Sequence, residues 1–444
     1  MQEPERVVDE TGAEHVLERC IGRGGQGRVW LTAGGRRIVK LLPRRRDPEA
    51  LRRQLAFVRR LDLRGLHVAK PLALLKSPRV GYVAEFLTGM APIASLISAP
   101  RSGLGQWWND ETGGLRRRLR VLAHAGEALA GLHGRGVIYA DLSHDNVFVS
   151  ASTSATEAWL IDLDNLSHSS DPCTAIYTPW YGAPELVNNV GGCTTLSDAW
   201  SFAVLVYSTL TLTHPLIGDY VSEGEPELEE EALAGRLPWV GCTTDQRNYA
   251  STGIPAFLTM GRKLNELARK TFEDGVNNRR LRPGVAEWVA RLHAAADQTV
   301  TCPGCGASYF VNADVCPWCD EEPRPRLVRV DIARWQPHVG LVAGTPRLGV
   351  VPLTDTGVRL PLRITRGLSG VSARELHVAL DLAPRGVIVR ALDGREVWVA
   401  PVTNEKHEYY RVTGSGRTVP RDGWMVFFEH PDRPQRVAVM RSMS

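Results

Sequence analysis

The period of the hydrophobic pattern changes twice along the chain, and this order restricts the fold more than any other feature. Short alternating runs come first, within residues 15–87, interrupted by one helical pattern with Leu51, Leu55 and Val58 on one face. Longer runs with helical spacing follow from about residue 115 to residue 295, and alternation returns beyond residue 327. Because period two is typical of strands and a period near 3.6 of helices, the sequence predicts a small β-rich lobe, a larger helical lobe and a C-terminal all-β module.

Turn residues bound the predicted elements. Strands are predicted over 15–22, 28–32, 36–42, 68–75 and 80–87, and helices over 51–61, 115–134, 197–212, 257–272 and 284–296. Gly34-Gly35 lies between two of these strands, and Asp393-Gly394 lies between the strand patterns 387–392 and 395–402. Both dipeptides are typical of two-residue hairpins, so we expect the flanking strands to pair in each case.

Composition and charge exclude several classes of protein. The chain has 444 residues, of which 43% are hydrophobic and 23% charged, so it has the composition of a packed multidomain protein. Its 53 basic and 49 acidic side chains leave a net charge of +4, which does not indicate nucleic acid or a membrane surface as a partner. The first residues carry no secretory pattern, and the most apolar run, 199–212, is too short for a membrane span. We therefore expect a cytoplasmic protein.

Four of the eight cysteines form two close pairs, Cys302 with Cys305 and Cys316 with Cys319. Four thiolates in two such pairs suit a tetrahedral structural Zn²⁺ site without an open coordination position. Unpaired reduced cysteines or two local disulfides are the alternatives. The spacing favours a zinc ribbon, which with its linker would occupy residues 297–326.

A glycine-rich turn joins the first two strands of the small lobe. Its residues are Gly22, Gly24, Gly25, Gln26, Gly27 and Val29. A dinucleotide-binding fingerprint would open a helix, which this run does not, and a plain glycine hairpin is an equal alternative for the run alone. However, Lys40 ends the next strand, in a chain with only six lysines, and an ammonium group there suits phosphate oxygens. The two features together favour phosphate binding.

Further segments follow in a fixed order. Residues 138–149 place Asp141 and Asn146 five positions apart, and the strand-like run 159–164 contains Asp162. Residues 178–185 are Thr-Pro-Trp-Tyr-Gly-Ala-Pro-Glu, residues 197–201 open the apolar helix, and Arg282 precedes Pro283. Each acidic residue alone could be a capping or surface carboxylate. In this order and spacing, residues 15–295 resemble a eukaryotic-type serine/threonine protein kinase domain of bacterial appearance.

The resemblance implies a two-lobed α+β fold and a set of roles. Asp141 would orient or deprotonate the substrate hydroxyl, and Asn146 and Asp162 would hold Mg²⁺. Lys40 would contact the ATP phosphates, while the glycine run, Val29, Glu85 and Leu87 would surround the nucleotide. Arg282 would pair with Glu185. Thr178 before Pro179 is similar to kinases that phosphorylate serine or threonine rather than tyrosine.

Four positions depart from the family pattern. Ala140 replaces the arginine before the catalytic aspartate, Ser143 replaces a lysine, and Asp164 replaces the glycine of Asp-Phe-Gly. Gln54 stands where a helix glutamate would pair with Lys40; it can hydrogen-bond the lysine but cannot neutralise it. A nucleotide-binding pseudokinase scaffold that acts through its zinc and β modules is therefore the main alternative. A small-molecule kinase is a third, disfavoured by the peptide-docking segment 178–185.

The predicted organisation has four parts. They are an N-terminal extension, 1–14; a kinase-like domain, 15–296, whose small lobe ends near 90; the zinc ribbon and linker, 297–326; and an all-β sandwich, 327–444. In the last part, Ile364, Arg366, Ser372 and His377 are faintly similar to forkhead-associated phosphothreonine-binding domains, although their spacing departs from that pattern. The predicted function is ATP- and Mg²⁺-dependent transfer of the γ-phosphoryl group to a protein serine or threonine, with a phosphopeptide or regulatory protein as partner of the β module.

Overall fold

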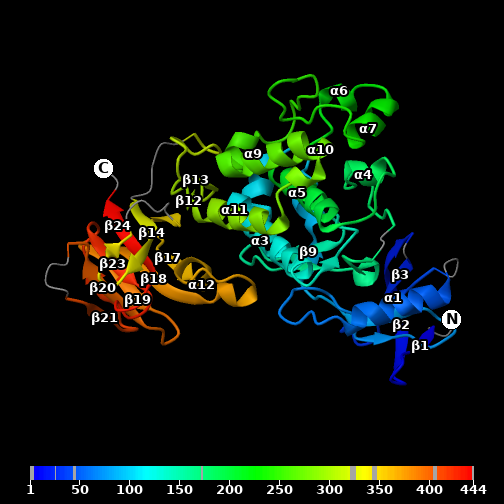
Figure 1. The fold of residues 1–444 in the computed structure, drawn as a ribbon, viewed down its shortest axis with the longest axis horizontal. Coiled ribbons are helices and arrows are strands. Elements are labelled where there is room, and N and C mark those ends of the chain that lie inside the picture. Colours follow the sequence, from blue (N-terminus) through cyan, green and yellow to red (C-terminus); the bar gives the residue numbers. More distant parts are fainter. Residues whose placement is uncertain are drawn as a thin grey trace. The chain divides into compact units, whose positions relative to one another are not determined.

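The structure is a computed structural model that describes residues 5–25, 27–43, 47–171, 174–320, 327–342, 348–403 and 408–442 (Figure 1). The chain forms two compact units. The first comprises Met1–Ala99, His124–Gly253 and Glu266–Trp288, and the second comprises Pro100–Ala123, Ile254–Asn265 and Val289–Ser444. Across the described residues, every helix is too short or too polar to cross a membrane.

A six-stranded antiparallel sheet forms the N-terminal part of the first unit, in the order β1-β2-β3-β4-β6-β5. In chain order, β1 to β6 are Arg6–Val8, Glu14–Gly24, Gly27–Thr32, Arg37–Leu41, Ala73–Leu74 and Gly81–Glu85. The strand β1 lies within the segment predicted as an extension, yet it pairs with β2. Val7 is buried and packs with Leu17 and Val39, so these residues belong to the sheet because they complete its core.

The Gly34-Gly35 hairpin is confirmed, since β3 and β4 pair and the two glycines have φ of +93° and +68°. The helix α1 (Pro48–Arg60) packs on this sheet (Figure 1). It begins at Asp47, whose carboxylate accepts a hydrogen bond from the Glu49 N–H at 2.9 Å, and at Pro48, which the first turn tolerates. Its buried residues Leu55 and Val58 lie on the predicted apolar face.

Short sheets and helices make up the rest of the first unit. The strands are β7 (Met90–Pro92), β9 (Val147–Ser150) and β10 (Ala158–Leu160) in one sheet, and β8 (Val137–Ile138) with β11 (Ser167–His168) in another. The helices and helical turns are η1 (Ile93–Leu96), η3 (Leu163–Asn165), α4 (Pro184–Val187), α5 (Thr195–Thr211), α6 (Asp219–Ser222), α7 (Pro226–Leu233), η4 (Lys270–Asp274), α10 (Gly275–Asn277) and η5 (Arg279–Leu281). Three more helices contribute residues to both units: α3 (Gly114–His133), α9 (Gly261–Arg269) and α11 (Val285–Asp297).

The helix α5 contains the most apolar run of the sequence and is buried from Ser197 to Thr211. A capping box starts it: the Ser197 N–H donates to the Thr194 hydroxyl at 3.2 Å, and the Thr194 N–H donates to the Ser197 hydroxyl at 2.8 Å. Two of its hydroxyls bond within the helix, since Thr209 donates to the Leu205 carbonyl at 2.7 Å and Thr211 donates to the Tyr207 carbonyl at 2.9 Å. The predicted buried helix is confirmed.

Within residues 327–342, 348–403 and 408–442, the C-terminal part of the second unit is all-β apart from two helical turns, α12 (Leu362–Thr365) and η6 (Val371–Arg374). One sheet has the order β15-β14-β24-β23-β20-β21, with β16 also paired to β14, and the other has the order β17-β18-β19-β22. The strands are β14 (Val328–Gln336), β15 (Gly340–Leu341), β16 (Gly349–Leu353), β17 (Val358–Pro361), β18 (Leu376–Ala383), β19 (Gly386–Ala391), β20 (Val397–Pro401), β21 (Tyr410–Val412), β22 (Arg417–Val419), β23 (Trp424–Phe427) and β24 (Gln435–Ser442). Residues of both sheets, such as Val330 and Leu380, share one hydrophobic core.

The predicted hairpin around Asp393-Gly394 is wrong, although the turn itself forms. Asp393 and Gly394 have φ of +52° and +67°, and the Arg395 N–H donates to the Leu392 carbonyl at 3.0 Å. However, β19 pairs with β18 and β22, whereas β20 pairs with β21 and β23 in the other sheet. The turn is a corner between two sheets, because burying the apolar faces of both strands in the shared core outweighs pairing them with each other.

His377 is fully buried at the start of β18 and belongs to the packing of this part of the chain. Its ring lies 2.9 Å from the Thr365 hydroxyl and 3.3 Å from the Glu396 carbonyl oxygen. Arg366, which also belongs to the forkhead-associated-like pattern, forms an ion pair with Glu429 at 3.3 Å. Both residues therefore have structural partners, and phosphopeptide binding here stays a prediction.

Acid is expected to destabilise this β module through His377. Burial, together with the charges of Arg366 and Arg395, lowers the pKa of His377 to about 4 from 6.5. The folded state therefore favours the neutral histidine. The contribution of His377 to the free energy of unfolding is fully present above pH 6.5 and is lost as the pH falls towards 4. At about 1.36 kcal/mol per pKa unit, this loss is at most about 3 kcal/mol. Thermal unfolding of the full chain from pH 7 to pH 4 measures this loss. A His377→Gln variant should show a flatter pH dependence, and equal slopes for both proteins would contradict the assignment.

Candidate active site and metal centre

A mostly apolar cavity of about 130 Å³ lies between the six-stranded sheet and the strand β9 with the two residues that follow β10. Every second residue of two strands faces this cavity: Ile38 and Lys40 of β4, and Tyr82 and Ala84 of β6. The remaining lining residues are Ile21, Val29, Ala69, Glu85, Phe86, Leu87, Phe148, Ile161 and Asp162. An apolar slot with a few charged groups at its edge suits a flat heterocycle that carries an anionic group.

The predicted nucleotide residues divide between this cavity and the turn beside it. Val29, Lys40, Glu85, Leu87 and Asp162 line the cavity. The glycines Gly22, Gly24, Gly25 and Gly27 lie in the β2–β3 hairpin and outside the cavity wall, and Gln26 lies outside the described residues.

Two glycines of this hairpin have different surroundings. A Cβ at Gly27, where φ is +137°, would lie 2.3 Å from the Leu41 carbonyl oxygen, so β3 can pair with β4 only without a side chain there. A Cβ at Gly24 would meet no atom within 4 Å. The backbone at Gly24 therefore borders open space into which a ligand could approach.

Lys40 is 4% exposed, and two carboxylates share its ammonium group. One is that of Asp162, which it contacts directly. The other is that of Asp164, whose two oxygens lie 3.1 and 3.2 Å from the Lys40 Nζ. A buried ammonium ion requires such partners, because an unpaired charge in the interior is strongly unfavourable.

The two carboxyl groups differ in protonation. Burial and the neighbouring Asp164 raise the pKa of Asp162 to about 7. Burial also opposes ionisation of Asp164, but hydrogen bonding from Asp162 and the charge of Lys40 outweigh it and lower the pKa of Asp164. Ionisation is therefore more favourable at Asp164 than at Asp162. The backbone at Asp162 is left-handed, with φ and ψ both +59°, which turns the chain from β10 into η3.

A buried carboxylate on α5 shapes the loop that carries Asp141. Asp198 is 1% exposed and accepts hydrogen bonds from the Tyr139 N–H at 2.7 Å and the Ala140 N–H at 2.9 Å. Its Oδ2 also lies 2.9 Å from the His133 ring. These contacts hold Ala140 at φ +73°, a conformation that L-residues otherwise avoid. The peptide bonds before Asp141 are therefore held in one orientation.

The loop brings Asp141 and Asn146 to the end of the strand that precedes Asp162. The Asn146 side chain donates to the Asp141 carbonyl at 2.8 Å, and the Ile161 N–H donates to the Asn146 carbonyl at 3.0 Å. The Thr178 hydroxyl donates to the Asp141 carboxylate at 2.7 Å. Carboxylate and amide oxygens are the ligands that Mg²⁺ prefers, so Asn146 and Asp162 fit this ion.

The predicted pair of Glu185 and Arg282 is confirmed. Two hydrogen bonds of 2.8 Å join the guanidinium to the carboxylate, and the Arg282 Nε donates to the Gly275 carbonyl at 2.8 Å. The Arg282 side chain is 1% exposed and lies 4.8 Å from the centre of the Trp200 ring. This bidentate pair fixes the end of the segment that contains Thr178.

Gln54 does not contact Lys40 as the sequence suggested. Its side-chain amide donates instead to the Leu166 carbonyl, one residue beyond η3. Gln54 does lie on the predicted inner face of α1. However, two aspartates already surround the Lys40 ammonium group, so the Gln54 amide instead satisfies a carbonyl beside the turn that carries Asp164. Sequence reasoning treated Asp164 only as a lost glycine, and the signal that it missed was a second acid two positions after Asp162.

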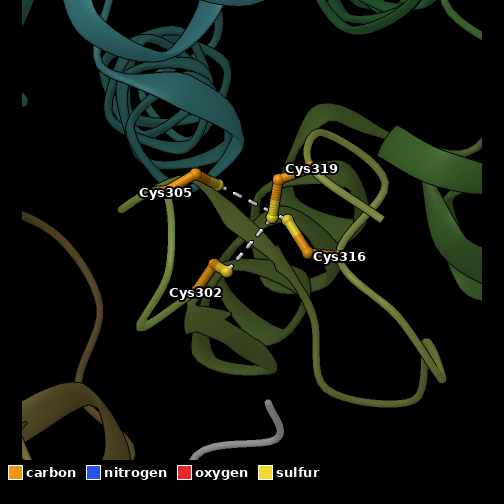
Figure 2. Close-up of side chains that lie close together, drawn as sticks. All are labelled: Cys302, Cys305, Cys316 and Cys319. Atoms are coloured by element: carbon orange, nitrogen blue, oxygen red, sulfur yellow. Dashed lines mark hydrogen bonds between the residues drawn. The ribbon is translucent and has the colours of Figure 1, made fainter. Parts of the chain in front are cut away.

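The four cysteines of the predicted zinc ribbon converge, as Figure 2 shows. Their sulfur atoms all lie within 4.8 Å of one another, and those of Cys302 and Cys319, and of Cys305 and Cys316, are 3.7 Å apart. Zn–S bonds of about 2.3 Å in a tetrahedron require sulfur atoms about 3.8 Å apart. The cysteines are free thiols, so the disulfide alternative is wrong and the geometry fits Zn²⁺.

The ribbon packs tightly against other residues of the second unit. Its strands β12 (Thr299–Thr301) and β13 (Ser308–Phe310) pair, and the Arg116 guanidinium donates to the Thr299 hydroxyl at 2.7 Å and the Thr299 carbonyl at 2.8 Å. Trp318 stacks on Trp108 with 5.9 Å between ring centres. The other short elements here are α2 (Leu104–Gln106), η2 (Trp107–Glu111) and α8 (Ala256–Thr259).

Comparison with known proteins agrees with this site. Residues 112–279 match the protein kinase domain, and residues 29–173 match the lipopolysaccharide kinase (Kdo/WaaP) family. The chain is 29% identical over 237 residues to the serine/threonine-protein kinase Pkn1 of Myxococcus xanthus, which is 50% of this chain and 30% of that protein. It is 36% identical over 131 residues to the serine/threonine-protein kinase pkn2 of the same organism, which is 28% of this chain and 15% of that protein. It is also 29% identical over 212 residues to the CBL-interacting protein kinase 4 of Oryza sativa subsp. japonica, which is 44% of this chain and 44% of that protein. The chain thus spans less than half the length of these relatives, and its residues 112–279 are similar to the protein kinase domain.

Removal of the metal is expected to loosen the ribbon. A Cys316→Ser variant loses a buried thiolate ligand, so zinc should fall from one per chain to nearly none. Because Trp318 stacks on Trp108, the intrinsic tryptophan fluorescence should change as the zinc leaves. Elemental analysis and fluorescence measure both effects, and Cys242→Ser, outside the cluster, is the matched control. Full zinc content in Cys316→Ser would contradict the assignment.

Gln54→Glu is expected to impair rather than improve the site. A carboxylate cannot donate to the Leu166 carbonyl, so two acceptors would face each other and about 1–3 kcal/mol of stability would be lost. Chemical denaturation of Gln54→Glu measures this loss, with Gln54→Met as the control that leaves a carbonyl unpaired without adding charge. If Gln54→Glu is as stable as the wild type, the hydrogen bond from Gln54 to the Leu166 carbonyl does not contribute to the free energy of unfolding, and the prediction is wrong.

Proposed function

We propose that the protein is an ATP- and Mg²⁺-dependent kinase that transfers the γ-phosphoryl group to a serine or threonine hydroxyl of a protein. One observation carries the proposal: a single region of the first unit joins the cavity, Lys40, Asp162 and the loop with Asp141 and Asn146. The match of residues 112–279 to the protein kinase domain and the similarity to serine/threonine kinases support it. Within the described residues the cysteines are free thiols, which agrees with a reducing compartment such as the cytoplasm.

Each group has a task that follows from its position. The cavity would accept the adenine ring, with Glu85 and Leu87 at its edge, and Lys40 would bind phosphate oxygens. Bound Mg²⁺, held by Asn146 and Asp162, would neutralise charge on the transferring phosphoryl group. Asp141 would accept the proton of the acceptor hydroxyl while the hydroxyl oxygen bonds to the γ-phosphorus and the bond to ADP breaks. Thr178, which hydrogen-bonds Asp141, would position this carboxylate.

The nature of the acceptor distinguishes this proposal from two others. By the resemblance to protein kinases, residues 178–185 bind the peptide substrate. This segment is fixed by the ion pair of Glu185 with Arg282 and by the hydrogen bond of Thr178 to Asp141, which favours a protein acceptor. The match of residues 29–173 to a lipopolysaccharide kinase family makes a sugar hydroxyl the competing acceptor. Ser143 is buried and supplies no cation to the phosphoryl group, so a scaffold that binds nucleotide without turnover is the other outcome.

Replacement of Asp141 tests the proposal. Asp141→Asn should lower phosphoryl transfer about 10²- to 10⁴-fold, the usual contribution of a general base, while nucleotide binding is retained. Transfer from γ-labelled ATP to a library of serine- and threonine-containing peptides measures the rate. Asp145→Asn, whose side chain is 69% exposed in the same loop, should remain near the wild type. Binding of ATP and Mg²⁺ by the wild type without transfer to any peptide would overturn the proposal and favour the scaffold.

A further inference from the structure

The charge of Lys40 is balanced without the helix α1. The only acidic residue of α1 is Glu49, which is 84% exposed and lies 3.8 Å from Arg53. Gln54, on the inner face of the helix, donates to the Leu166 carbonyl. The two carboxylates that surround the ammonium group therefore both come from the turn that follows β10.

These two carboxylates have different surroundings. Asp162 lines the cavity and its side chain is 19% exposed, so a ligand can reach it. The side chain of Asp164 is 6% exposed and is outside the cavity wall, and both of its oxygens lie within 3.2 Å of the Lys40 Nζ. If the Asp162 carboxylate binds a cation in the cavity, Asp164 still contacts the Lys40 ammonium group with both of its oxygens.

We propose that Asp164 is the positioning residue of Lys40, the task that the sequence resemblance assigns to a glutamate on the helix. The inference rests on the proposed function, since it concerns how the phosphate-binding lysine is held. Asp164 does not touch the nucleotide site itself: it keeps the ammonium group in place while Asp162 is engaged elsewhere. A carboxylate at this position explains how the chain keeps an ordered Lys40 with Gln54 in the helix.

The turn that carries Asp164 is well supported. Leu163 is fully buried, and the Leu166 N–H closes η3 on the Leu163 carbonyl at 3.2 Å. Gln54 binds the Leu166 carbonyl, so the helix α1 holds the turn, and the turn holds the lysine. Asp164 itself has an ordinary helical backbone, so it needs no glycine-like freedom. The position of α1 thus still controls Lys40, but through Gln54, η3 and Asp164.

A double-mutant cycle without nucleotide tests the pairing. Asp164→Asn keeps the size of the side chain and removes its charge, and Lys40→Met removes the ammonium group. We expect the two changes together to lower the midpoint of thermal unfolding by clearly less than the sum of the single changes, because each leaves the other charge unpaired. Additive effects would overturn the proposal. If Asp164→Asn alone does not fold but the double variant does, the pairing is supported in the same way.

Kinetics of the full chain then separate positioning from a purely structural role. Asp164→Asn should lower kcat about tenfold to a hundredfold, as loss of a hydrogen bond between charged groups does, with a smaller change in the KM for ATP. Asp164→Glu, which keeps the charge, should recover part of the rate, and Glu49→Gln is the surface control. Unchanged kcat in Asp164→Asn, despite coupling in the cycle, would overturn the positioning role.

The outcomes also separate this inference from the proposed function. If the wild type transfers no phosphoryl group, the proposed function fails, and the affinity for ATP with Mg²⁺, measured by calorimetry, replaces the rate. A weaker affinity in Asp164→Asn than in Glu49→Gln would then support positioning of Lys40, and equal affinities would overturn it.

Discussion

The buried carboxylate of Asp198 is the contact on which the candidate active site depends most. It accepts the N–H groups of Tyr139 and Ala140 and lies against His133, all in the interior of the first unit. Without it, Ala140 would have to hold a left-handed backbone at a cost of about 1–2 kcal/mol, and two N–H groups would be unpaired in the core. The anchor sits on α5, whose burial along nearly its whole length makes it a rigid base for the loop.

The surroundings of Lys40 show how a site can keep an interaction while changing the residue that makes it. A buried ammonium group needs a permanent anion, but physical chemistry does not specify which element must supply it. Here the turn after β10 supplies two carboxylates, and the amide of Gln54 links α1 to that turn. The helix α1 therefore influences Lys40 indirectly, through Gln54 and the turn after β10. The position of α1 is coupled to the site although α1 forms no ion pair with the lysine.

The cysteine cluster shows the same dependence on packing in the second unit. Four thiols that are close in the sequence define where a metal can bind. The ribbon is also held by the Arg116 guanidinium of α3, which donates to Thr299 of β12, and by the stacking of Trp318 on Trp108. In this respect it is an integrated part of its unit rather than a freely tethered adaptor. The two β-sheets that follow share one apolar core, beside which the buried His377 ring lies 2.9 Å from the Thr365 hydroxyl, whereas the exposed Arg366 pairs with Glu429.

Local patterns in the sequence were sufficient for features that depend on neighbouring residues or on a short motif. The glycine hairpin at Gly34, the buried helix α5 and the cysteine pairs follow from backbone freedom, apolar periodicity and ligand spacing, and each is present in the structure. The pairing of Arg282 with Glu185 followed from family resemblance. Tertiary structure alone decided the partners of groups that could be satisfied in several ways. The turn at Asp393 joins two sheets, the first strand joins the N-terminal sheet, and Gln54 bonds to Leu166 while Asp164 takes Lys40. The reason is that a hydrogen bond or ion pair is worth little net energy by itself, so burial of apolar surface and complete satisfaction of the interior select among alternatives that look equal along the chain.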